Sequence, residues 1–243
     1  MVGVRSGLAV CLVGAVALLA VLRVGPAGWG AGTACAVVLA VAAGRRAGVD
    51  GVSSFGPADL VTLTRATLAC GVAGLVGEAL AGREETGTLV AITAAALVLD
   101  LVDGRVARRT GTATAYGARL DGEADAFLIL VLSVVVAGEH GAWVLGLGLV
   151  RYVYAVAARL LPWMHRPLPP RYWRKVVAAY VGIALTVAAS GLAPAATTYA
   201  ALVVAALLLA ESFGWDVVWL WRRRLNRAGA EDVLPAKVLE HGR

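Results

Sequence analysis

Residues 100–125 read DLVDGRVARRTGTATAYGARLDGEAD, a stretch that contains four aspartates: Asp100, Asp103, Asp121 and Asp125. The first two lie at the end of one apolar stretch, 87–103, and the last two at the start of the next, 120–137. A charged side chain is costly inside a bilayer, so acids at such positions face a bundle interior or a wet cavity. The helical repeat puts each pair on one helix face, one turn apart. The stretch therefore predicts two neighbouring membrane helices that direct four carboxylates into one pocket.

Apolar stretches of this kind recur along the whole chain. The 243 residues are 60% hydrophobic and 16% charged, with a mean hydropathy of +0.78, whereas soluble domains are nearer to about half apolar and about a quarter charged. None of the stretches shows the alternation of a barrel strand. We distinguish eight of them: 7–22, 29–43, 59–81, 87–103, 120–137, 142–161, 175–192 and 196–221. The predicted fold class is an all-α polytopic membrane helix bundle.

One segment differs in composition from its neighbours and suggests how the chain is divided. Residues 44–58, RRAGVDGVSSFGPAD, combine two arginines with glycines and prolines and have modest apolarity. We interpret them as a cytoplasmic linker between a two-helix amino-terminal module, 1–43, and a six-helix core, 59–221. The module contains no acid and is rich in Gly, Ala and Val, which suits close helix packing without polar chemistry. Residues 222–243 are predicted to form a cytoplasmic tail.

The basic residues indicate the orientation of the bundle. If the amino terminus is cytoplasmic, the outward loops carry Arg23 and Arg83, and the inward loops carry every other arginine that lies in a loop. Cytoplasmic loops of membrane proteins are enriched in Lys and Arg. We therefore expect a multi-pass protein of the cell (plasma) membrane, with both termini and the four aspartates on the cytoplasmic side.

The residue types around the aspartates indicate their chemistry. Carboxylate oxygens suit hard divalent cations such as Mg²⁺ or Mn²⁺, and no Cys or His is near in sequence to favour zinc. Small residues and an arginine share the segment: Gly104, Ala107, Arg108 and Gly117. Metals, a small-residue platform and an arginine together describe a site for a nucleotide diphosphate. The alternative is an interfacial salt-bridge cluster, in which the acids pair with nearby arginines: Arg105, Arg108, Arg109 and Arg119.

The same residues fit the pattern DxxDGxxAR(x8)GxxxDxxxD at every defined position, so the segment resembles the CDP-alcohol phosphatidyltransferase family of integral membrane enzymes. The resemblance covers about 57–221 and implies a homodimer that moves a phosphate-linked alcohol from a CDP-alcohol to an acceptor hydroxyl, with release of CMP. It implies a two-metal site, with Asp100, Asp103 and Asp121 as ligands. It also implies that Asp125 contacts the second metal and acts as general base. Four residues would hold the CDP moiety: Gly104, Ala107, Arg108 and Gly117.

A weaker resemblance concerns the start of the first core helix. Many family members begin this helix with Asn-x-x-Thr-x-x-Arg, and here residues 59–65 read DLVTLTR. Thr62 and Arg65 match and are expected to contact the CDP group. Asp59 replaces the asparagine, and an aspartate cannot donate the hydrogen bonds of an amide. The alternative for Asp59 is a helix cap after Pro57.

The acceptor site is predicted from basic residues in the last third of the chain. Arg151 lies in the middle of a span, where an arginine needs an anionic partner. That partner is either a phosphate on the acceptor, as in glycerol 3-phosphate or an inositol phosphate, or an internal acid such as Glu211 or an active-site aspartate. Glu211 and Asp216 are expected to be structural partners. The proposed acceptor-binding residues are Arg151, Arg159, Arg174 and Lys175. Within the family, the phosphatidylglycerophosphate synthase-like enzymes are the first expectation.

Two other classes of membrane protein also use intramembrane aspartates. A prenyltransferase combines aspartate-rich helices with Mg²⁺ and a diphosphate, but it does not need the small-residue platform. A cation transporter typically distributes its acids across the midplane, whereas these aspartates cluster at one face. The net charge of +6 is explained by basic cytoplasmic loops, and no basic soluble stretch with interleaved aromatics indicates nucleic-acid binding. The expected partners are a CDP-activated lipid such as CDP-diacylglycerol, a small alcohol acceptor and the lipid bilayer.

Overall fold

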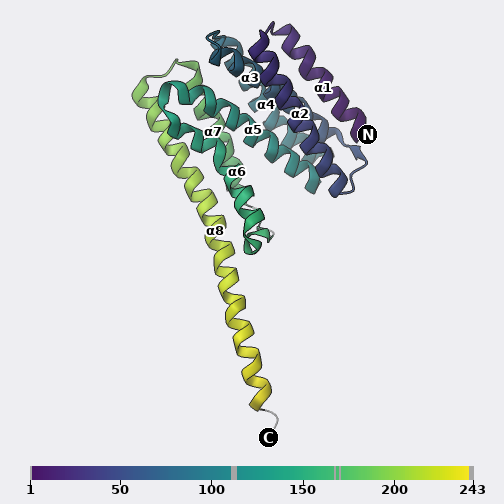
Figure 1. Ribbon diagram of the computed structural model, residues 1–243, viewed down its shortest axis with the longest axis vertical. Coiled ribbons are helices and arrows are strands. Elements are labelled where there is room, and N and C mark those ends of the chain that lie inside the picture. The colour runs from purple at the N-terminus through teal and green to yellow at the C-terminus, as the bar shows by residue number, and fades with distance from the viewer. Residues whose placement is uncertain (1, 111–113, 167, 170, 241–243) are drawn as a thin grey trace.

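The computed structural model describes the backbone of residues 2–110, 114–166, 168–169 and 171–240, and their side chains except those of 101–110 and 226–240. This part of the chain is almost entirely helical, and the helices lie side by side in a bundle (Figure 1). The α-helices are α1 Val4–Val21, α2 Pro26–Val49, α3 Pro57–Leu80, α4 Thr86–Thr110, α5 Ala115–His140, α6 Leu145–Leu160, α7 Trp173–Ser190 and α8 Ala195–Glu240. Two 3₁₀ helices flank α6, η1 Ala142–Val144 and η2 Pro162–His165. The predicted all-α class is confirmed.

Six helical segments of the described chain are long and apolar enough to cross a membrane. They are Val4–Val21, Pro26–Val49, Pro57–Leu80, Ala142–Leu160, Trp173–Ser190 and Ala195–Leu225. In α4, the part with described side chains is the shorter apolar segment Thr86–Asp100, and the first half of α5 carries acidic residues. The protein is therefore a multi-pass membrane protein. Among the residues whose side chains are described, the segments within the predicted spans 87–103 and 120–137, which carry the aspartates, do not meet these criteria.

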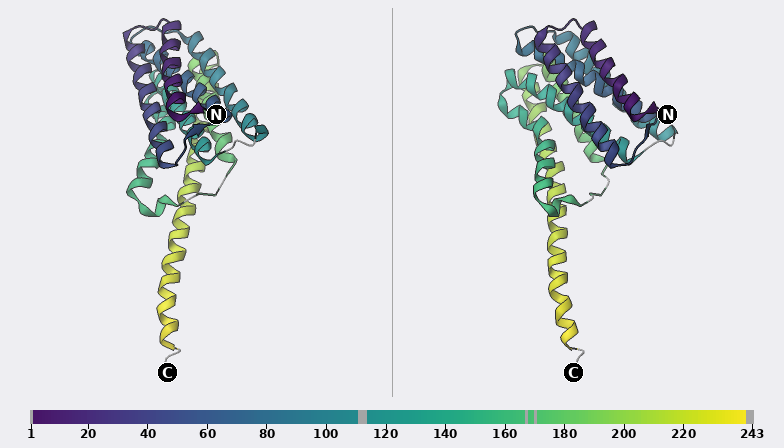
Figure 2. Two further views of the ribbon diagram at one scale, coloured as in Figure 1. Left: turned by 90° about the vertical axis from the view of Figure 1, so that its right-hand side faces the viewer. Right: turned by 45° about the vertical axis from the view of Figure 1, so that its right-hand side comes forward.

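Helix α3 is the centre of the bundle. It packs against α1, α2, α4 and α5, and 72% of its apolar span is buried, against 22% for the spans of α1 and of α2. The two views of Figure 2 show α1 and α2 on one side of the molecule. Valines on their outer faces, including Val10 and Val38, are exposed in the isolated chain and suit contact with lipid.

Glycines allow α2 and α3 to approach closely. A β-carbon added at Gly28 would lie 2.8 Å from the carbonyl oxygen of Gly74, and one at Gly77 would lie 2.9 Å from that of Ala27. Small residues serve this purpose in membrane bundles, where close van der Waals packing holds helices together. The buried carboxylate of Glu78 accepts a hydrogen bond from the Gly28 amide at 2.7 Å, which satisfies one of the free N–H groups at the start of α2.

A short sheet joins the amino terminus to the segment before α3. Strand β1, Val2–Gly3, pairs antiparallel with β2, Ser54–Phe55. Helix α2 continues through Arg45 and Arg46 to Val49, so the helix extends into the segment that was expected to be a linker. The division of the chain into an amino-terminal module and a core stays a prediction.

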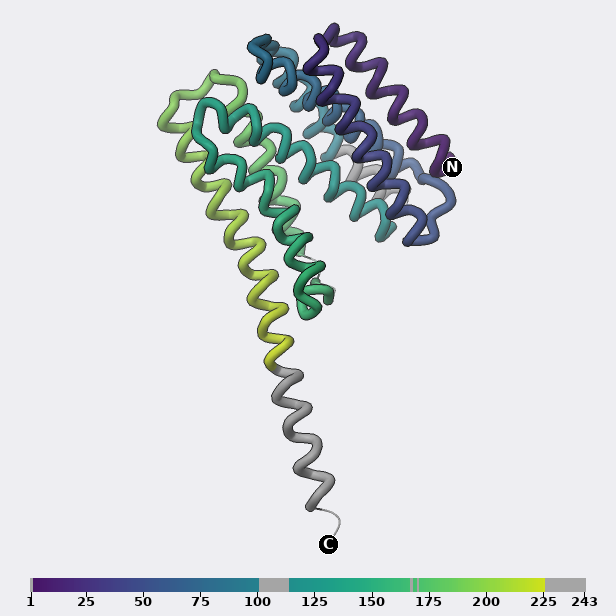
Figure 3. Tube along the Cα trace, in the orientation of Figure 1, coloured from purple at the N-terminus to yellow at the C-terminus, as the bar shows by residue number. Residues whose placement is uncertain are grey.

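The remaining helices form the other side of the bundle. Helix α7 packs against α4, α5 and α8, while α6 packs against α5 and α8. Figure 3 shows α6 running beside the first half of α8. This arrangement leaves a space between α5, α6, α7 and α8 that opens next to the aspartates of α5.

Candidate active site

Three of the four predicted aspartates meet at one point between α4 and α5. The carboxylates of Asp100, Asp121 and Asp125 each offer an oxygen atom, and these atoms lie within 4.8 Å of one another. Asp100 comes from α4, and the other two are stacked one turn apart near the start of α5. The helical spacing thus produces the predicted convergence. The side chain of Asp103 lies outside the described residues, as do those of Gly104, Ala107 and Arg108.

Arg65 of α3 lies in the middle of this carboxylate cluster. Its Nη1 atom is 3.0 Å from Oδ1 of Asp100, and the same guanidinium also pairs with Asp121 and Asp125. Only 3% of the Arg65 side chain is exposed. Lys175 of α7 adds a second cation, with its Nζ atom 3.3 Å from Oδ2 of Asp121. Arg65 was predicted to bind CDP, and the structure brings it to the aspartates; its contact with CDP stays a prediction.

Within the described residues, the aspartates form salt bridges with an arginine that the sequence analysis had not suggested for this role. Of the four arginines considered for that role, Arg119 pairs with Asp50 at 2.7 Å rather than with the cluster. The side chains of Arg105, Arg108 and Arg109 lie outside the described residues. Among the described side chains, the cations that pair with the aspartates are Arg65 of α3 and Lys175 of α7, both far from their partners in the sequence.

The donor set of this cluster fits a hard divalent cation. Its potential ligands are carboxylate oxygens, the type that Mg²⁺ and Mn²⁺ prefer. Three like charges this close together repel one another, so the arrangement needs positive charge beside it. Arg65 and Lys175 supply part of that charge in this structure. The residues present are thus compatible with a metal-dependent site.

The start of α3 forms a second wall beside the cluster. Oδ2 of Asp59 accepts a hydrogen bond from the Gly56 amide at 2.8 Å, so the capping interpretation of Asp59 is confirmed. Oδ1 of Asp59 is buried and has no hydrogen-bond partner in the described part of the chain. A β-carbon at Gly117 would lie 2.7 Å from that oxygen, so Gly117 lets α5 approach Asp59. Thr62 is buried one turn further on, and its hydroxyl donates to the Ala58 carbonyl at 3.2 Å.

A cavity of about 820 Å³ lies between α5, α6, α7 and α8, and Asp121 and Asp125 form part of its wall. Much of the lining is apolar, with contributions from Ile129, Leu147 and Phe213. Its polar part contains acids as well as hydrogen-bond donors, and the donors include Arg151, Tyr154, Arg171, Arg174 and Lys175. The cavity can therefore hold a ligand that is partly apolar and partly rich in oxygen atoms.

Each arginine of the cavity has an acidic partner. The sequence had suggested Glu211 or an active-site aspartate as the internal partner of Arg151. The structure shows a different partner, because Arg151 pairs with Glu123 at 2.8 Å. Glu123 lies two residues after Asp121 on α5. It is 28 residues away from Arg151, so no local sequence pattern predicts this pair.

Glu211 and Asp216 of α8 are structural partners, as expected. Asp216 pairs with Arg174 at 3.1 Å, and Glu211 pairs with Arg171 at 3.4 Å. Glu211 also accepts a hydrogen bond from the Trp173 indole at 2.7 Å. Arg159 is exposed and is not among the residues that line the cavity.

Several donors in the cavity wall remain unsatisfied despite these pairs. Nη1 of Arg171, Nε of Arg174, Nε of Arg151 and the hydroxyl of Tyr154 are buried without a hydrogen-bond partner in the described residues. Buried polar groups are normally hydrogen-bonded, so these donors are available to a ligand with several acceptor atoms. Arg171 and Tyr154 were not among the acceptor-binding residues predicted from the sequence. The spacing Arg171-x-x-Arg174 at the start of α7 was the available signal.

The described helices and the acidic cluster define a multi-pass membrane protein with a polar site at one end of its bundle. The family model for CDP-alcohol phosphatidyltransferase matches residues 55–221, more than half of the chain. This chain belongs to the CDP-alcohol phosphatidyltransferase family, a family of phosphotransferases. No curated protein and no solved structure matches the chain significantly. Family membership favours a CDP-alcohol donor and an alcohol acceptor over the prenyltransferase and transporter alternatives.

Proposed function

We propose that this protein transfers a phosphatidyl group from CDP-diacylglycerol to the hydroxyl of a small acceptor alcohol and releases CMP. The observation that carries this proposal is the convergence of Asp100, Asp121 and Asp125 beside a large, partly apolar cavity. In the reaction, the acceptor oxygen forms a bond to the phosphorus of the lipid phosphate. The bond between that phosphorus and the bridging oxygen breaks, and CMP leaves with this oxygen.

The carboxylates would hold the divalent metal on which enzymes of this family typically depend. We assign Asp100, Asp103, Asp121 and Asp125 as ligands of Mg²⁺ or Mn²⁺ in a two-metal site. When bound, the metal neutralises charge on the pyrophosphate and polarises the phosphorus that is attacked. Arg65 holds three of these carboxylates together from α3. The proposed contacts of Thr62, Arg65, Gly104, Ala107, Arg108 and Gly117 would hold the CDP moiety.

Asp125 is the proposed general base. It belongs both to the carboxylate cluster and to the wall of the cavity, so an acceptor in the cavity can reach it. Its carboxylate takes the proton of the acceptor hydroxyl as the new bond to phosphorus forms. A base in hydrogen-bond reach of the proton is the geometric requirement for this role.

The acceptor that fits the cavity best is a phosphorylated alcohol, as in the phosphatidylglycerophosphate synthase-like enzymes. The unsatisfied donors of Arg151, Arg171, Arg174 and Tyr154 support this proposal, because phosphate oxygens accept several charge-assisted hydrogen bonds. Lys175 lies between this group of donors and the carboxylate cluster. We also propose that the enzyme is a homodimer of the plasma membrane with a cytoplasmic active site.

The test measures CMP release by the purified full chain in liposomes that contain CDP-diacylglycerol. Candidate acceptors are glycerol 3-phosphate, inositol 1-phosphate and their unphosphorylated alcohols. We expect release only with a phosphorylated acceptor and only with Mg²⁺ or Mn²⁺. Asp125→Asn should lose turnover and keep most of its affinity for the CDP-lipid, whereas Asp121→Asn should also lose metal affinity. Full turnover in excess EDTA would contradict the metal site, and release with the unphosphorylated alcohols alone would contradict the acceptor assignment.

The acceptor residues have a matched control on the same side of the molecule. Arg174→Gln should raise the KM for the acceptor by about tenfold or more, because hydrogen bonds to charged groups are among the strong ones. Arg159→Gln should leave this KM unchanged, because Arg159 does not line the cavity. Equal effects of the two substitutions would show that the cavity is not the acceptor site.

A further inference from the structure

The residues that precede the family match make direct contacts with the helix that carries Asp121 and Asp125. The match begins at residue 55, so α1, α2 and β1 lie outside it. Two side chains near the start of α5, Tyr116 and Arg119, nevertheless end on this amino-terminal segment. The segment is thus connected to the active-site helix as well as to α3.

Tyr116 is the buried member of this pair. Only 3% of it is exposed, and its hydroxyl donates a hydrogen bond to the carbonyl oxygen of Ala43 in α2 at 3.1 Å. Its ring stacks on Phe55, with 5.9 Å between the ring centroids and an interplanar angle of 16°. Phe55 is fully buried and contacts α1 closely, because a β-carbon at Gly7 would lie 2.5 Å from its ring. One tyrosine therefore touches both α2 and the strand that precedes α3.

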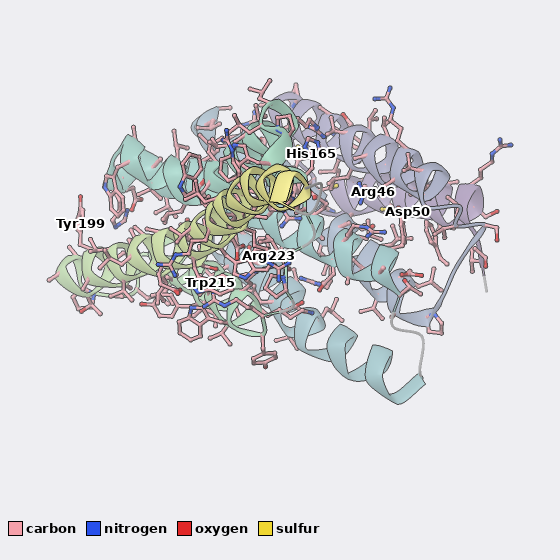
Figure 4. All side chains as sticks on the ribbon, turned by 90° about the horizontal axis from the view of Figure 1, so that it is seen from below. Arg46, Asp50, His165, Tyr199, Trp215 and Arg223 are labelled. Atoms are coloured by element: carbon pink, nitrogen blue, oxygen red, sulfur yellow. The ribbon has the colours of Figure 1, made fainter. Side chains whose placement is uncertain are left out.

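Arg119 makes the second connection through an ion pair. Its Nη2 atom is 2.7 Å from Oδ2 of Asp50, the residue that ends α2. Asp50 also pairs with Arg46, at 3.3 Å, and Figure 4 shows these two labelled residues next to each other. The Asp50 carboxylate thus pairs with Arg46 of α2 and with Arg119 of α5 at the same time.

The amino-terminal segment can serve as a fixed support because it is anchored independently. Close contacts at Gly28 and Gly77 and the hydrogen bond from Gly28 to Glu78 join α2 to α3 at the far end of both helices. The pairing of β1 with β2 fixes the near end. Any shift of α5 relative to this support would have to break the contacts of Tyr116 or of Arg119.

Helical geometry relates these contacts to the active site. At about 100° per residue, Asp121 and Asp125 lie about 140° and about 180° around the helix from Tyr116. The amino-terminal segment therefore holds one side of α5 while the opposite side presents its carboxylates to α3 and α4. Gly117, the neighbour of Tyr116, is the residue that lies against Asp59. A small rotation of the helix at Tyr116 would move both active-site carboxylates.

We propose that residues 1–54 position the metal-binding carboxylates of α5, and that Tyr116 and Arg119 are the positioning residues that transmit this effect. This inference rests on the proposed function, since it takes Asp121 and Asp125 as metal ligands. It gives the two extra helices a role that the family match does not include. Neither Tyr116 nor Arg119 needs to touch the metal or a substrate.

The test measures Mn²⁺ binding to the purified full chain by electron paramagnetic resonance of the free ion, without any substrate. We expect Tyr116→Phe and Arg119→Gln each to raise the Mn²⁺ concentration at half-saturation by about threefold to tenfold, as expected for loss of one supporting hydrogen bond or ion pair. The Mn²⁺ concentration for half-maximal CMP release should rise by the same factor. The KM for CDP-diacylglycerol at saturating Mn²⁺ should not change, whereas general loosening of the structure would alter it.

Two matched controls separate positioning from general stability. Tyr180→Phe removes a similar tyrosine-to-carbonyl hydrogen bond, from Tyr180 to Ala201 at 3.4 Å, between α7 and α8. Arg46→Gln removes the other partner of Asp50 but leaves the link to α5. Both controls should bind Mn²⁺ as the wild type does. Asp50→Asn removes the same ion pair from the side of α2. The double variant Asp50→Asn/Arg119→Gln should bind Mn²⁺ no more weakly than either single variant does.

The possible results distinguish this inference from the proposed function. Wild-type Mn²⁺ binding in both target variants would overturn the positioning role and leave the metal site intact. Equal losses in the target and control variants would also overturn it. Failure of the wild type and of Asp121→Asn alike to bind Mn²⁺ would overturn the proposed metal site and, with it, this inference.

Discussion

Substitution of Arg65 by glutamine tests how the carboxylate cluster is neutralised. Arg65 is 3% exposed and pairs with Asp100, Asp121 and Asp125, whose side chains are 29%, 12% and 25% exposed. Removal of one partner of a buried ion pair typically costs about 3–5 kcal/mol, because the remaining charge is left without compensation. For a chain of this size, each 1 kcal/mol lowers the unfolding temperature by about 2–4 °C. We therefore expect Arg65→Gln to unfold about 6–20 °C below the wild type in EDTA, toward the lower value because the acids are partly exposed.

Divalent metal should reverse much of this loss. A bound cation neutralises the same carboxylates, so Mg²⁺ should raise the unfolding temperature of Arg65→Gln more than that of the wild type. The assay is thermal unfolding in detergent micelles, followed by tryptophan fluorescence, with a series of Mg²⁺ concentrations. The matched control is Arg46→Gln, whose exposed pair with Asp50 is worth at most about 1 kcal/mol. Unfolding of Arg65→Gln at the wild-type temperature in EDTA, or a loss that Mg²⁺ leaves unchanged, would refute this reasoning.

Two further predictions concern the bundle and its orientation. Gly28→Ala should lower the free energy of unfolding by about 1–3 kcal/mol because of overpacking against Gly74. The control Gly30→Ala, with open space at its β-carbon, should be neutral or stabilising by up to about 1 kcal/mol. Equal effects of the two substitutions in thermal unfolding would contradict the close contact of α2 with α3. A cysteine in place of Gly87 should react with an impermeant maleimide in intact cells, and one in place of Ala115 only after permeabilisation; labelling at Ala115 in intact cells would reverse the proposed orientation.

The convergence of the aspartates was predictable because it depends on local geometry. Asp121 and Asp125 are one turn apart on a single helix, so their common direction follows from the helical repeat alone. That Asp100 joins them follows from the placement of both pairs at facing ends of consecutive apolar stretches. The all-α class depended on the length and apolarity of the same stretches, which are also properties of local sequence.

Contacts between segments that are distant in the sequence were harder to predict. Arg65 and Asp121 are separated by 56 residues, and nothing in the sequence around either one specifies the other. The matched Thr62-x-x-Arg65 opening predicts a role in binding CDP, whereas the protein partners of Arg65 depend on how α3 is rotated in the bundle. The pair of Arg151 and Glu123 escaped prediction for the same reason.

The hydrogen bond between Gly28 and Glu78 has a consequence for the biosynthesis of this protein. The two residues are 50 positions apart, so the ribosome completes α2 well before it adds the last turn of α3. Until then, the N–H group of Gly28 lacks its carboxylate acceptor, and unsatisfied backbone groups are costly in a bilayer. The glycine surface of α2 likewise has no matching helix to contact during this interval. The first two helices can enter the membrane as a hairpin during translation, but their final packing has to await the third.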